Sequence, residues 1–180
     1  KNSYKTLEEA HRTVSRFFNV NLNNAFVVNN FSSGIRHVIR FLPKKLKVLL
    51  IDNDYPSLIS AFEEEDFLIH KVPMLDIGLE DQIDDYISKN QIDILALSIV
   101  QYSTGLLIDI NFLESLKLKH PNLILIGDGT QFLGAHKFSF DSSPFDVVAS
   151  SGYKWLLAGF GNGVLMISKR YLDLINKEAS

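Results

Sequence analysis

The sequence predicts an α/β fold of three layers, with helices on both faces of a mainly parallel, seven-stranded sheet. Five segments carry nearly unbroken apolar residues, which is typical of strands buried on both faces. They are residues 47–52, 92–100, 122–127, 145–150 and 163–168. Two weaker apolar segments, residues 25–29 and 67–72, are expected to add one strand each. Stretches with helical periodicity separate the strands, and this alternation favours the α/β class.

Apolar residues at spacings of three and four predict three helices between these strands. The first covers residues 6–18 and begins with a capping-box pattern at Thr6. The second covers residues 79–87, and the third begins near Asn111 and ends with lysines, the charge order that a helix dipole favours. No repeat or linker divides the chain, so residues 1–180 are expected to form a single domain.

The composition excludes several classes of function. The 180 residues include 18 basic and 21 acidic side chains, a formal charge of −3, without the basic excess of a nucleic-acid-binding protein. No cysteine is present, which excludes a disulfide, a thiolate metal site and a cysteine nucleophile within these residues. The five histidines lack metal-ligand spacing, so no metal site is expected. No apolar run approaches the ~20 residues that span a bilayer, and we expect a soluble, cytoplasmic protein without a membrane partner.

Polar residues that directly follow the apolar segments are the candidates for chemistry, because ligands of open α/β sheets bind beyond the carboxyl ends of the strands. Ser33 and Gly34 follow the weak strand at residues 25–29 and precede a helical segment at residues 37–42. A serine–glycine turn at a helix start offers free backbone N–H groups, which suit a phosphate. The alternative is that Ser33 only caps the helix.

Asp128 and Lys154 each follow a strongly apolar strand. Asp128 lies between two glycines, which would let a ligand approach the backbone, and Gln131 follows three residues later. The alternative for Asp128 is a helix cap or a magnesium ligand. Lys154 lies between Tyr153 and Trp155, so we expect it to be partly desolvated and available as a nucleophile toward a carbonyl. The alternative for Lys154 is an ordinary surface charge.

Two tyrosines, Tyr55 and Tyr102, also follow buried strands, and each either packs with its hydroxyl satisfied or faces the same site. One cofactor, pyridoxal 5′-phosphate (PLP), would use all of these groups. PLP needs a lysine for its Schiff base, a carboxylate beside its ring nitrogen, a helix start for its phosphate and an aromatic side chain over its ring. The sequence therefore predicts a PLP site.

In these motifs the sequence resembles the class V aminotransferase family, the fold-type I PLP enzymes that include cysteine desulfurases, selenocysteine lyase and kynureninase. The resemblance runs from about residue 5 to the C-terminus. The family's Asp-x-x-Gln motif matches Asp128 and Gln131, which implies contacts to the pyridinium nitrogen and to the phenolic oxygen. The family's Ser-x-His-Lys motif resembles residues 151–154, which implies that Ser151 binds the phosphate and Lys154 is the Schiff-base lysine, with Tyr153 in place of the histidine.

The remaining motifs complete the site that the resemblance implies. The family's Thr-Ser-Gly-Ala-Thr phosphate turn is similar to residues 32–36, so the implied phosphate contacts are Ser33, Gly34, Ile35 and Arg36. Arg36 stands where the family has threonine, and it either replaces the hydroxyl contact with charge or points to solvent. The ring-stacking histidine of the family falls on Tyr55. Residues 98–105 resemble the family's Ser-His-Val-Ser-Asn-x-x-Gly segment, with Tyr102 at the asparagine.

The resemblance implies an enzyme that acts on an amino-acid substrate through Lys154, most simply an aminotransferase. A cysteine desulfurase or selenocysteine lyase is the first alternative, and a non-catalytic α/β module is the second. Family members are roughly twice this long and build their active sites across a homodimer. The chain is therefore expected to hold the core of the large domain without the C-terminal small domain, and to be incomplete for catalysis by itself.

Overall fold

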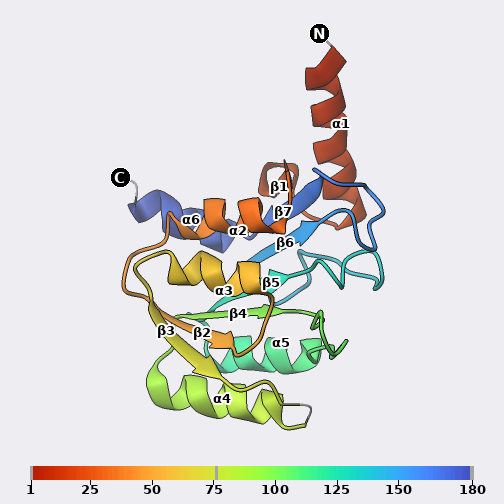
Figure 1. Cartoon of the computed structure of the whole chain (residues 1–180). Helices are drawn as coiled ribbons and strands as arrows, with labels where there is room; N and C mark the ends of the chain where they lie inside the picture. Colours follow the sequence, from red (N-terminus) through yellow and green to blue (C-terminus); the bar gives the residue numbers. More distant parts are fainter. Residues whose placement is uncertain (1, 76, 179–180) are drawn as a thin grey trace.

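The computed structural model describes residues 2–75 and 77–178. Within these residues seven strands form one sheet in the order β1-β7-β6-β5-β4-β2-β3 (Figure 1). The strands are β1 Ala25–Val28, β2 Lys47–Ile51, β3 Leu68–Val72, β4 Ile94–Ser98, β5 Ile124–Asp128, β6 Val147–Ser151 and β7 Gly163–Ile167. Only β7 runs antiparallel to its neighbours, β1 and β6, in this sheet. The predicted mainly parallel, seven-stranded sheet is confirmed.

Helices cover both faces of the sheet, as predicted. Helices α2, α3 and α6 lie on one face and α4 and α5 on the other, whereas α1 extends away from the sheet near β1 and β7 (Figure 1). The helices are α1 Asn2–Phe17, α2 Phe31–Ile39, α3 Pro56–Glu63, α4 Leu79–Asn90, α5 Ile110–Lys119 and α6 Lys169–Glu178. A short 3₁₀ helix, Leu22–Asn24, leads into β1. None of the helices in the described residues is long and apolar enough to cross a membrane.

Successive side chains of the central strands enter two separate cores, one on each face of the sheet. In β2, Leu49 and Ile51 pack with the residues of α4 and α5, whereas Val48 and Leu50 pack with those of α2, α3 and α6. All four side chains are buried. A strand that is buried on both faces has no polar face, which is why its sequence is unbroken in apolar residues.

The helix boundaries depart from the prediction in several places. Helix α1 begins before Thr6, so that residue lies inside the helix and does not cap it. The cap of α5 is Asp109, whose side chain accepts a hydrogen bond from the backbone N–H of Asn111. Helices α3 and α6 were not predicted. In α3, Pro56 at the first helical turn supplies a φ angle suited to a helix start.

The topology brings four connections to the same edge of the sheet. Strands β2, β4, β5 and β6 run in the same direction, so their carboxyl ends meet there. The segments that follow these strands contain most of the site residues predicted from the sequence.

Candidate active site

A cavity of about 110 Å³ opens at the carboxyl ends of the parallel strands. It is lined by Tyr55, Ser98, Val100, Tyr102, Asp128, Thr130, Gln131, Tyr153 and Lys154. Six of these nine were predicted as site residues, and the three that were not are Ser98, Val100 and Thr130. The lining residues come from the ends of four different strands and from the connections that follow them, as the strand-end argument requires.

Asp128 is the last residue of β5, and its side chain is buried, with 3% of the residue exposed. Its Oδ1 accepts a hydrogen bond of 2.8 Å from the backbone N–H of Thr130. Burial raises the pKa of Asp128 to about 7; the hydrogen bonds from Thr130 lower it, and the nearby charge of Asp54 raises it. Among the described residues no basic side chain forms an ion pair with Asp128. The carboxylate therefore lacks a cationic partner that a ligand can supply.

Packing requires the two glycines around Asp128, and the ligand approach expected from the sequence stays a prediction. A Cβ atom on Gly127 would lie 2.9 Å from Cε1 of Phe145. A Cβ atom on Gly129 would lie 2.8 Å from Cγ of Leu133. Larger residues at these positions would displace the core beneath the cavity and with it the turn that holds Asp128.

The start of α2 lies next to the end of β6, which brings two of the predicted phosphate residues together. Asn30 caps the helix by accepting a 2.8 Å hydrogen bond from the N–H of Ser33, whose Oγ accepts one from the N–H of Asn30. The Oγ of Ser151 accepts the N–H of Phe31 at 3.0 Å. In the described residues the N–H of Ser32 has no partner. The bond between Phe31 and Ser151 places the helix start, with its free N–H and its dipole, beside the Ser151 hydroxyl, an arrangement that suits an anion.

Two residues of the predicted phosphate turn face the sheet. Helix α2 begins at Phe31 and not at residue 37 as predicted, so residues 32–36 lie in its first turns. Ile35 is fully buried in the core on this face of the sheet, and Gly34 is buried beside Val28, whose Cγ2 would lie 3.4 Å from a Cβ at that glycine. A Cβ at Gly34 would therefore make an ordinary contact, so packing does not require glycine at this position, and Ile35 places no side chain at the cavity.

The structure places Arg36 away from the cavity. Its guanidinium forms a pair of hydrogen bonds with the carboxylate of Glu64, at 2.6 and 3.0 Å, and donates to the hydroxyl of Ser60 at 3.0 Å. The arginine thus ties α2 to the end of α3. It neither replaces the expected hydroxyl contact at the helix start nor points freely into solvent.

Lys154 lines the cavity on a tight loop after β6. Its Nζ lies 5.6 Å from the centroid of the Tyr153 ring, which stacks on Phe160 at 4.9 Å. The loop closes through a 2.7 Å hydrogen bond from the N–H of Gly152 to the carbonyl of Asn162, and a Cβ on that glycine would lie 2.7 Å from the same oxygen. Lys154 is exposed, so the desolvation expected from its flanking residues is not found.

Aromatic side chains and one amide form the remaining wall. The rings of Tyr55 and Tyr102 meet edge to face at 5.5 Å, and Tyr55 also contacts the ring of Phe31 at 6.3 Å. The Oε1 of Gln131 accepts a 3.1 Å hydrogen bond from the indole N–H of Trp155. Because this bond occupies the amide oxygen, the amide NH₂ group is the end of Gln131 that remains to donate to a ligand.

Three residues with structural roles at the site were missed by the sequence analysis. Asp54 is buried and hydrogen-bonded to Ser98, and Asn30 caps α2. Thr130 connects the Asp128 turn to the end of β6, because its Oγ1 accepts the N–H of Ser151 at 3.2 Å. Each lies two or three residues after the end of a strand, so the strand-end rule contained a signal for all three.

The model of the aminotransferase class-V family matches residues 1–178. The chain belongs to the class-V aminotransferase family. This is a family of PLP-dependent enzymes, so the predicted family and the α/β fold are both confirmed. A search of curated proteins found no match for this class-V aminotransferase family member.

Several solved structures share the fold of this class-V family member. The cystine C-S lyase C-DES, in complex with its reaction product cysteine persulfide, matches with a TM-score of 0.87 at 18% identity over 95% of this chain and 48% of that one. Ureidoglycine–glyoxylate aminotransferase from Bacillus subtilis matches at 0.84 and 16% identity over 100% and 48%. Alanine–glyoxylate aminotransferase from Nostoc sp. matches at 0.82 and 15% identity over 95% and 47%. The chain thus spans about half the length of these structures.

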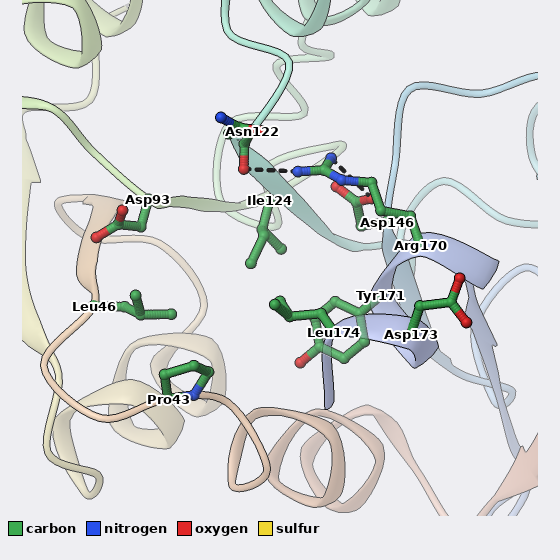
Figure 2. Close-up of a pocket in the computed structure, with 10 residues that line it drawn as sticks. All are labelled: Pro43, Leu46, Asp93, Asn122, Ile124, Asp146, Arg170, Tyr171, Asp173 and Leu174. Carbon is green, nitrogen blue, oxygen red and sulfur yellow. Dashed lines mark hydrogen bonds and ion pairs between the residues drawn. The ribbon is translucent and has the colours of Figure 1, made fainter. Parts of the chain in front are cut away.

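A second groove, of about 530 Å³, lies at the opposite edge of the sheet (Figure 2). It is lined by Pro43, Leu46, Asp93, Asn122, Ile124, Asp146, Arg170, Tyr171, Asp173 and Leu174. The buried carboxylate of Asp146 pairs with Lys117 and, at 3.4 Å, with Arg170, which also donates to the Asn122 carbonyl at 2.7 Å. Burial lowers the pKa of Lys117, whereas Asp146 raises it. Asp146, Lys117 and Arg170 already neutralise one another, and their bonds join β5, β6 and α6. The cavity at the carboxyl ends of the strands is therefore the candidate active site.

Proposed function

We propose that this chain is the cofactor-binding part of a PLP-dependent enzyme that acts on an amino acid through a Schiff base at Lys154, with transamination as its reaction. The observation that carries the proposal is the buried carboxylate of Asp128, which lacks a cationic partner and shares one small cavity with Lys154 and Gln131. A buried carboxylate without a cation is unfavourable, and a protonated ring nitrogen would stabilise it.

The residues present fit each part of PLP. The carboxylate of Asp128 would accept a hydrogen bond from the protonated ring nitrogen, and the free NH₂ of Gln131 would donate one to the phenolic oxygen. The start of α2 would hold the phosphate through the N–H of Ser32 and the hydroxyl of Ser151, because the N–H and the hydroxyl of Ser33 are already bonded to Asn30. Tyr55 lines the cavity and would lie against the ring. When bound, PLP supplies the electron sink for the bonds at the substrate's α-carbon.

Lys154 holds and moves protons in this proposal. Its amine would hold PLP through the Schiff base. With the substrate bound in its place, the same amine would be the general base that takes the proton from the substrate's α-carbon. The Nζ of Lys154 lies over the face of the Tyr153 ring, which helps to place the lysine side chain at the cavity. The bond between Trp155 and Gln131 fixes the amide so that its donor end points to the cavity side.

The reaction subclass rests on what the chain carries. Tyr153 and Tyr102 stand where the resemblance places the histidine and the asparagine of desulfurase-type motifs, so the match to a desulfurase is weaker. We therefore favour transamination, and keep cysteine desulfurase or selenocysteine lyase as the alternative in which the second acid or nucleophile comes from elsewhere. The non-catalytic module remains the alternative that predicts no cofactor binding.

We also infer that two copies pair near the cavity. Three large apolar side chains on the lysine loop are exposed: Trp155 at 57%, Leu157 at 87% and Phe160 at 85%. A second copy covering them would remove this apolar surface from water. Sedimentation of the chain at rising concentration tests this, and a monomer at every concentration would contradict it.

Trapping the cofactor tests the proposed function. PLP is added to the chain, the linkage is reduced with borohydride, and the labelled peptide is identified by mass spectrometry. We expect one pyridoxyl label, on Lys154, and none in Lys154→Ala. Lys137→Ala is the matched control, because this exposed lysine lies outside the cavity, and it should be labelled like the wild type. No label, or a label spread over exposed lysines, would overturn the proposal.

A further inference from the structure

Asp54 is a buried carboxylate that the proposed function does not use. It follows β2 and is only 2% exposed. Its Oδ1 accepts the N–H of Tyr55 at 2.6 Å and the hydroxyl of Ser98 at 2.5 Å, and its Oδ2 accepts the N–H of Ser98 at 2.9 Å. One side chain thereby fixes two cavity-lining residues that come from different strands.

Asp54 is also coupled to Asp128 through this wall of the cavity. Ser98 is the last residue of β4 and pairs in register with Asp128, the last residue of β5. The negative charge of Asp54 adds to burial in raising the pKa of Asp128. No basic side chain pairs with either carboxylate in the part of the chain that the structure describes. Two buried carboxylates so arranged repel each other, so the arrangement is unfavourable until a cation arrives.

We propose that Asp54 is a positioning residue for Asp128, which holds the Ser98 and Tyr55 wall in place and adds a second negative charge, so that the cavity selects a ligand with a cationic ring nitrogen. This inference rests on the proposed PLP site. It deepens that site by assigning the selectivity for the protonated ring to two carboxylates and not to Asp128 alone.

Few other titratable groups share this cavity. The connection after β2 contributes Asp54 and Tyr55, the one after β4 contributes Tyr102, and the loop after β6 contributes Tyr153 and Lys154. Lys154 is the only basic group among the residues that line the cavity, and it is exposed. Removing the charge of Asp54 therefore changes the balance around Asp128 more directly than a change at the outer tyrosines would.

Asp54→Asn tests the inference, with Asp52→Asn as the matched control. Asp52 is half-buried in the same connection and does not line the cavity. The first measurement needs no cofactor: ¹³C NMR of the aspartate carboxyl carbons, with Asp128→Asn used for assignment. In Asp54→Asn we expect the pKa of Asp128 to fall from about 7 by about half a pH unit, and in the control to stay unchanged.

The second measurement is the affinity for PLP at pH 8, followed by quenching of the single tryptophan, Trp155, which contacts Gln131 at the cavity. The dissociation constant should rise about fivefold in Asp54→Asn and stay within twofold in Asp52→Asn. A merely structural role for Asp54 predicts a less stable chain with the Asp128 titration unmoved. If Asp54→Asn fails to fold by circular dichroism, Asp54→Ser supplies a smaller neutral acceptor for the same N–H groups.

The outcomes separate the two proposals. If the wild-type chain does not bind PLP, the proposed function fails, and the selectivity assigned to Asp54 fails with it. If the wild type binds PLP but the Asp54 variant matches the Asp52 variant in both measurements, only the role of Asp54 is overturned. A lowered pKa of Asp128 together with weakened PLP binding supports the inference.

Discussion

Asp128→Asn is expected to change how the stability of the cofactor-free chain depends on pH. The pKa of Asp128 is about 7 in the folded chain, and that of an unfolded aspartate is about 3.9. Between these values the folded chain binds more protons than the unfolded chain, so the free energy of unfolding falls as the pH rises. Each pKa unit is worth about 1.36 kcal/mol, and a difference of about three units gives about 4 kcal/mol between pH 4 and pH 7. Above about pH 7 the effect levels off.

The asparagine variant removes this titration with little change of shape. Its side-chain oxygen still accepts the N–H of Thr130, and its amide carries no charge to bury. Asp128→Asn should therefore gain stability relative to the wild type as the pH rises. Of the total change of about 4 kcal/mol, the two pH units between pH 5 and about pH 7 account for about 3 kcal/mol.

Urea unfolding followed by circular dichroism at pH 5, 6, 7 and 8 measures this difference. Asp141→Asn serves as the control, because Asp141 is exposed and lies outside the cavity. Its free energy of unfolding should stay parallel to that of the wild type at every pH. If the difference between Asp128→Asn and the wild type is constant or shrinks from pH 5 to pH 8, the burial argument for Asp128 is refuted.

Three further predictions concern the surroundings of the site. Arg36→Ala should leave the PLP dissociation constant within twofold of the wild type in a fluorescence titration, because its guanidinium is held by Glu64; a large loss would place it at the phosphate. Asn30→Ala should lower the free energy of unfolding in urea by about 1 kcal/mol through loss of the α2 cap, and no change would contradict the cap. Asp146→Ala should lower it by about 3 kcal/mol, because the half-buried ammonium of Lys117 and the N–H of Leu125 would lose their partner, and a loss under 1 kcal/mol would contradict that.

The strands were predictable because their burial shows in the local sequence as an unbroken apolar run. Strands such as β4 and β5 are covered on both faces, so every position except the polar last one is apolar or glycine, and the pattern needs no knowledge of neighbours. Helix α3 was missed because it is only eight residues long, which leaves little room for a helical period to show. The cap of α2 at Asn30 was missed because the first turn, with its serines and glycine, reads as a loop from local composition.

At the site, the sequence identified the residues but not their connections. Asp128 and Lys154 were found because polar residues at strand ends stand out against apolar strands. The placement of Arg36 away from the cavity was not predictable, because its partner, Glu64, lies 28 residues further along the chain, at the end of α3. The link from Asp54 to Ser98 depends on β2 lying beside β4, a pairing that skips β3 in the chain order. Tertiary contacts of this kind leave no periodic signal in the sequence.

The unsatisfied groups around the cavity argue together for one ligand. In the described residues Asp128 has no cation, the N–H of Ser32 has no acceptor, and the amide NH₂ of Gln131 has no acceptor. A polar group that is shielded from water without a partner costs free energy, so a ligand that pairs with these groups gains binding energy at this place. These three would be satisfied by a ring cation, an anion and a phenolic oxygen, and PLP carries all three groups. A ligand lacking any one of them should leave the corresponding protein group unpaired and bind more weakly.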